Sequence, residues 1–163
     1  MEGEITSQVK IRFSDCDPIG HLSNSKYLEY MLNAREDHFE EICGYSYEDH
    51  IRQTGNTWVV TQNQITYLKE VRPNITVNIS SKIIQHDEYT SVVEILMKDA
   101  RNEIIHSVLW TTVVYFNMKE RRVIPCSPET LASFESNCKE ISEKHFGHRT
   151  ESLRKQNKQW KKY

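Results

Sequence analysis

The chain has 163 residues, of which 37% are hydrophobic and 27% are charged, and its net charge is −2 at pH 7. This balance predicts one soluble globular domain with a core of its own. The small negative charge argues against a nucleic-acid partner. No apolar run approaches the length of about 20 residues that a membrane-spanning helix needs, so no membrane span is expected.

The first residues, MEGEITSQ, have neither the basic nor the apolar segment of a secretion signal. We therefore expect a cytoplasmic protein with reduced thiols. The four cysteines form no C-x-x-C pair, which argues against zinc, and the sequence predicts no metal and no cofactor.

The first predicted element is a strand over residues 7–14, because Val9, Ile11 and Phe13 alternate with basic residues. A polar turn over residues 15–20 follows it. A strand, a tight polar turn and a helix start in succession would aim a side chain and several free backbone N–H groups at one point.

A long amphipathic helix is predicted next, over about residues 24–43. Ser23 or Asn24 suits its N-cap, and Gly44 suits its end. The residues expected on its apolar face are Tyr27, Leu28, Met31, Ala34, Phe39 and Ile42.

The middle of the chain is rich in Val, Ile, Thr, Tyr and Trp and predicts strands. A short helix between Ser46 and Gly55 precedes them, and a further helix begins at Ser127-Pro128. Short links predict one antiparallel sheet with a helix over one face, and the open edge of such a sheet could be closed by a second copy. The predicted strands cover residues 57–68, 75–85, 90–98 and 104–117.

Basic residues outnumber acidic ones in the last segment, so we divide the chain into a domain of residues 1–144 and a basic tail of residues 145–163. The simpler interpretation is a solvated tail, partly helical or frayed. The alternative is a basic surface for phosphates or acidic lipid.

The segment from Asp15 to Tyr30 reads DCDPIGHLSNSKYLEY. It resembles the signature of hotdog-fold acyl-CoA thioesterases of the 4-hydroxybenzoyl-CoA thioesterase type. The likeness extends over about residues 8–125 and includes Ala34-Arg35-Glu36 and Tyr67-Leu68-Lys69. The positions that match the signature are Asp17, Gly20, His21, Asn24 and Tyr27.

The resemblance implies an α+β hotdog fold, in which a curved antiparallel sheet wraps around one long central helix. It implies hydrolysis of acyl-CoA, or of an acyl carrier protein thioester, at a site on a dimer interface, in a homodimer or homotetramer. Asp17 would be the nucleophile or general base, helped by His21 and Asn24. Gly20, Tyr27 and the amides that begin the helix would position the substrate and its oxyanion.

Elementary chemistry agrees with this role. An aspartate is ionised at pH 7, and a CoA thiolate leaves readily because thiols ionise near pH ~8.5. The amino end of a helix supplies free N–H groups and about half a positive charge for the oxyanion. No metal is needed.

Each of these residues also has a structural alternative. Asp17 could fix the Asp-Pro turn, Asn24 could cap the helix, and Tyr27 could be a core or pocket wall. His21 could be structural, and Asp15 is expected to bond turn amides.

Basic groups near strand ends are candidates for the CoA phosphates, namely Lys69, Arg72 and Lys82. Arg35 could pair with a carboxylate at the dimer contact. The aromatic residues Trp58, Tyr67, Trp110 and Tyr115 favour a short, branched or aromatic acyl group.

Two other functions remain open from the sequence. A hotdog hydratase would need a D-x-N-P-(aliphatic)-H motif, whereas this chain has Asp17 for the Asn and one extra residue, Gly20, before the His. A non-catalytic acyl-CoA sensor is the other alternative, and the intact Asp17 speaks against it.

Overall fold

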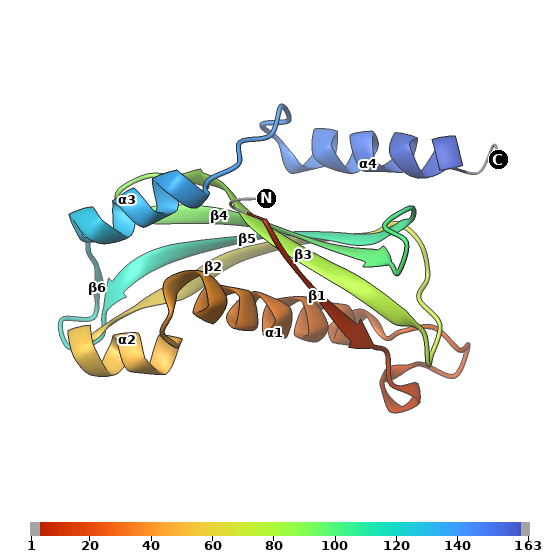
Figure 1. Cartoon of the computed structure of the whole chain (residues 1–163), viewed down its shortest axis with the longest axis horizontal. Coiled ribbons are helices and arrows are strands. Elements are labelled where there is room, and N and C mark those ends of the chain that lie inside the picture. The colour runs from red at the N-terminus through yellow and green to blue at the C-terminus, as the bar shows by residue number, and fades with distance from the viewer. Residues whose placement is uncertain (1–3, 161–163) are drawn as a thin grey trace.

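An antiparallel sheet forms the centre of the computed structural model, which describes residues 4–160. The strand order is β1-β3-β4-β5-β2, and a short β6 pairs with β5 (Figure 1). The order leaves β1 and β2 at the two edges. The strands are β1 (Ile5–Lys10), β2 (Asn56–Tyr67), β3 (Thr76–His86), β4 (Thr90–Asp99), β5 (Ile105–Asn117) and β6 (Arg122–Val123).

The sheet curves around one long helix, α1 (Asn24–Cys43), which lies along its inner face (Figure 1). Register shifts interrupt three of the strand pairings, between Val60 and Gln62, between Ile83 and Gln85, and between Met97 and Lys98. Such irregularities bend a strand and increase its twist. The predicted fold of a curved antiparallel sheet around one helix is confirmed.

The predicted ends of the helices are largely confirmed. Gly44 adopts the left-handed conformation with φ 76°, and its N–H bonds the Glu40 carbonyl to end α1. The second helix, α2 (Tyr47–Thr54), begins with a capping box between Ser46 and Asp49. Ser23 occupies the N-cap position of α1, but its side chain makes no capping hydrogen bond.

The buried face of α1 contains two polar residues that the apolar pattern did not predict, Arg35 and His38. His38 places Nδ1 2.7 Å from Ser81 Oγ and Nε2 3.0 Å from Ser7 Oγ. These partners come from β3 and β1, so they offset the cost of burying the imidazole. A helical pattern alone does not reveal partners that lie so far away in the sequence.

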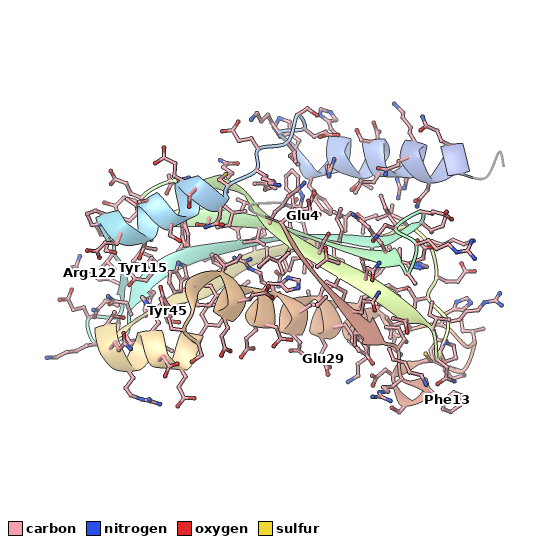
Figure 2. All side chains as sticks on the ribbon, in the orientation of Figure 1. Glu4, Phe13, Glu29, Tyr45, Tyr115 and Arg122 are labelled. Carbon is pink, nitrogen blue, oxygen red and sulfur yellow. The ribbon has the colours of Figure 1, made fainter. Side chains whose placement is uncertain are left out.

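The prediction of a strand over residues 7–14 is wrong at its end. β1 stops at Lys10, and residues Phe13–Asp15 form a short 3-10 turn, η1. Phe13 is 75% exposed and lies at the outer end of this turn (Figure 2). The Arg12 N–H donates to the Tyr30 hydroxyl instead of to a neighbouring strand, so the chain leaves the sheet here.

The two remaining helices are α3 (Pro128–Asn137) and α4 (Phe146–Trp160). α4 runs along the face of the sheet opposite α1 (Figure 1). Its Leu153 is 2% exposed and belongs to a second apolar cluster with Ile105 and Val108 of β5. The tail is helical, as the expectation of a partly helical segment allowed, but the expectation that it is only solvated or frayed is wrong, because α4 buries Leu153 on the sheet.

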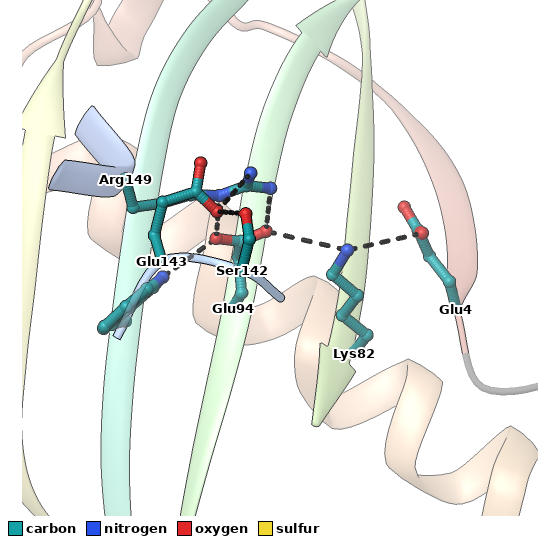
Figure 3. A network of polar contacts seen from close by, with 7 residues as sticks. Glu4, Lys82, Glu94, Ser142, Glu143 and Arg149 are labelled. Atoms are coloured by element: carbon teal, nitrogen blue, oxygen red, sulfur yellow. Dashed lines mark hydrogen bonds and ion pairs between the residues drawn. The ribbon is translucent and has the colours of Figure 1, made fainter. Parts of the chain in front are cut away.

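A polar network fixes α4 to the sheet (Figure 3). The buried Glu94 carboxylate accepts hydrogen bonds from Arg149 Nε at 2.8 Å, Arg149 Nη2 at 2.7 Å and Trp110 Nε1 at 2.9 Å. Lys82 Nζ lies 3.8 Å from Glu94, and Glu143 lies 3.6 Å from Arg149. A buried carboxylate is tolerated when its oxygens have partners of this kind.

None of the helices within residues 4–160 has the length and apolar character that crossing a bilayer requires.

Candidate functional site

The Asp17 carboxylate is held in place by the turn that precedes α1. Its Oδ1 accepts the N–H of Ile19 at 3.0 Å and the N–H of His21 at 3.1 Å. The turn closes through the Asp17 N–H, which donates to the His21 carbonyl at 2.8 Å, and Gly20 supplies the φ of 81° that the turn requires. Among residues 4–160, Oδ2 has no hydrogen-bond partner, so one oxygen is anchored while the other is available for chemistry.

The neighbouring Asp15 has a different environment. Its Oδ2 accepts a 2.6 Å hydrogen bond from the Tyr30 hydroxyl, and Oδ1 lies 3.6 Å from Lys26 Nζ. Its backbone carbonyl accepts the Ser23 N–H at 3.0 Å. These contacts tie the turn to the first two turns of α1, as expected of a structural residue.

Five of the predicted site residues, with Lys69 among them, line one cleft of about 350 Å³. The turn and α1 contribute one wall of this cleft, and the end of β2 with the residues after it contributes the other. The lining residues are Asp17, Ile19, His21, Leu22, Asn24, Tyr27, Tyr67, Leu68, Lys69 and Glu70.

The two tyrosines of the cleft support its wall. Tyr27 is buried and accepts the Val71 N–H at 3.1 Å, and burial raises the pKa of Tyr27 to about 12. Its ring meets Tyr67 edge to face at 5.0 Å, and the Tyr67 hydroxyl donates to the Asn24 carbonyl at 3.2 Å. Tyr27 is therefore a neutral phenol at pH 7 and suits positioning better than proton transfer.

The amino end of α1 opens beside this cleft. Asn24 is the first residue of the helix and not its N-cap, and Ser23 makes no side-chain cap. The first N–H groups of a helix have no partner within the helix and carry partial positive charge. The geometry therefore brings an anchored carboxylate and an uncapped helix end to one cleft.

Comparison with family models decides the family. Residues 11–134 match the model described as the Thioesterase-like superfamily. The chain belongs to this superfamily. The comparison with curated protein sequences finds no match.

Solved structures of similar fold agree with the superfamily assignment. A 1,4-dihydroxy-2-naphthoyl-CoA thioesterase from Synechocystis has a TM-score of 0.73 at 14% identity, covering 81% of this chain and 96% of that one. A Staphylococcus aureus protein in complex with CoA has a TM-score of 0.76 at 14% identity, covering 88% and 90%. At such identities the likeness shows the fold, and it confirms the predicted hotdog class.

One further structure is longer than this chain. It comes from Lactobacillus plantarum, is provisionally assigned as an oleoyl thioesterase, and has a TM-score of 0.76 at 22% identity. The match covers 88% of this chain, which spans only 55% of the length of that protein.

Glu70 also lines the Asp17 cleft, and the sequence analysis did not predict it. Its pKa lies below the usual value, first because its own backbone amide bonds the carboxylate and then because Lys69, His21 and Arg72 are near. The only sequence signal was a charged pair, Lys69-Glu70, directly after a predicted strand.

The three predicted CoA-binding residues are not brought together. Lys69 lines the Asp17 cleft, whereas Arg72 is exposed and lies outside its lining. Lys82 lies on the outer face of the sheet, 3.8 Å from Glu94 and 3.9 Å from Glu4 (Figure 3). Within one chain, Lys82 is therefore remote from this cleft, because strand alternation turns it away from α1.

The docked helix α4 supplies other basic groups. A second cleft of about 220 Å³ adjoins the first and shares Leu68 and Lys69 with it. Arg154 and Lys158 of α4 line the second cleft. This second cleft is called the basic cleft below. In the described part of the chain, no three His, Cys, Asp or Glu side chains converge in a way that could hold a metal ion.

Proposed function

We propose that this protein hydrolyses acyl-CoA thioesters, with Asp17 as the nucleophile or general base. Superfamily membership supports thioester hydrolysis. The observation that carries the residue assignment is the Asp17 carboxylate, anchored through Oδ1 and open at Oδ2 beside the amino end of α1. The signature around Asp17 further supports an enzyme of the 4-hydroxybenzoyl-CoA thioesterase type.

The proposed reaction has a simple balance. Asp17 either attacks the carbonyl carbon, forming an anhydride that water then opens, or it takes a proton from the attacking water. In both cases a C–O bond forms and the C–S bond breaks, which gives a carboxylic acid and a thiol. The thiolate is a good leaving group, so no strong acid is needed.

The other residues would support this step. First-turn amides of α1 would stabilise the oxyanion, and one such donor is typically worth about 2.7–4 kcal/mol in the transition state. His21 and Asn24 line the cleft and would orient the substrate or water. Gly20 shapes the turn, and Tyr27 with Tyr67 forms the wall against which the thioester lies.

The basic cleft would receive phosphates of CoA. It joins the Asp17 cleft through Lys69 and adds Arg154 and Lys158. Lys and Arg side chains bind phosphate oxygens strongly. The structural neighbour in complex with CoA supports a ligand of this type. Arg72 is close enough to influence Glu70 and could add to the same charge.

A second copy of the chain would cover the exposed edge of the sheet. β2 is an edge strand, and residues 59–63 at its centre are exposed. Two such edges can pair antiparallel about a two-fold axis. That pairing would bring the Tyr67 end of one β2 beside the Thr57 end of the other, so the Asp17 cleft would lie at the dimer contact. We propose a cytoplasmic homodimer, which could assemble further into a tetramer.

Release of free thiol from a panel of acyl-CoAs tests the proposed function. Asp17→Asn should lower kcat by about 100-fold or more, the scale of a lost general base. Asp37→Asn is the matched control, because Asp37 is an exposed aspartate on α1 away from the cleft. Circular dichroism of both variants checks the fold.

Three outcomes would contradict the proposal. Full activity of Asp17→Asn would exclude the assigned role of this carboxylate. Addition of water to crotonyl-CoA without thiol release would favour a hydratase. Binding of acyl-CoA with no turnover would favour a sensor.

A further inference from the structure

A further cavity, distinct from the basic cleft, lies on the inner face of the sheet and shares no lining residue with the Asp17 cleft. Its volume is about 220 Å³, and its lining residues come from α1, α2, α3, β2, β3, β4 and β5. Phe39, Val93 and Phe134 contribute to a mostly apolar wall. A cavity of about 150 Å³ already holds benzene, so this one can hold a group of ring size.

A buried cation lines this apolar cavity. Arg35 is 8% exposed, and burial lowers its pKa from the usual value. Its hydrogen bond to Ser81 Oγ is long, at 3.4 Å. No carboxylate within residues 4–160 lies at ion-pairing distance from it. A buried guanidinium without an anion is costly, since buried charges are normally paired.

Two residues of the same lining each carry a buried polar atom that lacks a hydrogen-bond partner. Trp58 Nε1 and Thr111 Oγ1 are buried, and neither has a hydrogen bond to any described residue. Each such group costs about 1–3 kcal/mol when it stays unpaired. The lining thus combines apolar side chains with a guanidinium, an indole N–H and a hydroxyl, all of which can donate to an acceptor, and it also includes the exposed Glu36.

We propose that this cavity binds a compact organic carboxylate, whose apolar body fills the cavity and whose oxygens bond Arg35, Trp58 and Thr111. The planar guanidinium suits a carboxylate because it can donate two parallel hydrogen bonds. Such a ligand would supply an anion to Arg35 and a hydrogen-bond partner to Trp58 and Thr111.

This inference rests on the proposed function, because it identifies the ligand as the acyl part of the substrate that is hydrolysed. The cavity borders β2 at Thr57, near the start of the strand, and at Val60, in its exposed centre. In the proposed dimer it would lie beside the Asp17 cleft of the other copy. The substrate class would then be a CoA monothioester of a short or aromatic dicarboxylic acid, with its free carboxylate at Arg35.

Binding of benzoate tests the site without any hydrolysis. Nitrobenzene is the matched control ligand, because it has nearly the same shape and no charge. We expect benzoate to bind at least about tenfold more tightly by calorimetry and to shift the indole N–H signal of Trp58 in NMR spectra, as assigned with Trp58→Phe. Thr111→Val should weaken benzoate binding about tenfold, since it removes one donor to a charged acceptor and keeps the side-chain shape.

Arg35→Met should remove the preference for benzoate over nitrobenzene. If Arg35→Met does not fold, Thr111→Val still tests the site. Equal binding of the two ligands, or benzoate binding that leaves the Trp58 signal unmoved, would overturn the inference. So would benzoate binding unaffected by Thr111→Val, because Thr111 would then not contact the ligand. Thiol release by a protein that ignores benzoate would leave the proposed hydrolysis intact and refute only this site.

Discussion

The Tyr30 hydroxyl donates a 2.6 Å hydrogen bond to Asp15, two residues before Asp17. One aspartate of the D-C-D sequence is therefore bonded by side chains of α1, whereas the other is bonded by amides of its own turn. The two carboxylates have the same chemistry in the sequence. Their surroundings give the first a structural role and leave the second with an open oxygen.

Tyr30→Phe should separate these roles. It removes the donor to Asp15, so we expect the free energy of unfolding to fall by about 1.5–3 kcal/mol, as for other hydrogen bonds to charged groups. Urea denaturation measures that loss. Thiol release should stay within about twofold of the wild type, because Asp17 keeps its amide bonds. A loss of activity like that of Asp17→Asn would contradict the structural role of Asp15.

Arg149→Met should unfold the protein more easily. It leaves Glu94 buried without its main partner, and breaking a buried ion pair in this way costs about 3–5 kcal/mol. Lys155→Met is the control, since Lys155 is exposed on the same helix and should change stability by less than about 0.5 kcal/mol. Equal denaturation midpoints for the two variants would show that α4 is not fixed by this network.

Arg154→Ala combined with Lys158→Ala should raise KM for an acyl-CoA and leave kcat close to the wild type. Each contact with a phosphate is taken as about 1 kcal/mol, so the pair should raise KM by roughly 30-fold. KM should also depend less on salt, since two charges are lost. Lys155→Ala serves as control because Lys155 does not line the basic cleft. An unchanged KM in the double variant would remove the basic cleft from CoA binding.

Stability should fall as the pH drops below 6.5. Burial lowers the pKa of His38, His50 and His106, with the Arg35 charge adding to the effect on His38. The unfolded chain therefore binds these protons at a higher pH than the folded one, so stability is full above pH 6.5 and is lost towards the lower folded pKa values. Urea denaturation at pH 7.5 and 5.5 measures this, and His106→Gln should reduce the slope. An unchanged slope in that variant would argue against the burial of His106.

Val59→Lys should weaken the proposed dimer. Val59 is 39% exposed at the centre of the β2 edge, where a lysine opposes pairing of strands. Light scattering should then report monomer at concentrations where the wild type is a dimer. Val123→Lys is the control, because Val123 is 43% exposed but lies on β6, away from that edge. If the Val59→Lys variant remains a dimer, the dimer forms through a surface other than the β2 edge.

The sequence by itself determined α1, α2, the start of α3, the four long strands and the position of the turn that holds Asp17. The reason is local: α1 follows from its apolar period and from Gly44, and α2 from the capping box of Ser46. Asp17 could be singled out because strand, turn and helix start are contiguous. The same reasoning was wrong at Phe13, because the alternation of apolar and basic residues continues past Lys10 whereas the backbone leaves the sheet there.

Only the tertiary structure decided which polar groups are buried and which charges meet. Arg35 lines a cavity, Glu94 is paired with Arg149, and Lys69 meets the α4 residues of the basic cleft. These partners are far apart along the chain, and no periodic pattern encodes such contacts. The free energy of burying a charge depends on the groups that pack against it, so burial and pairing of charges are decided only in the packed molecule.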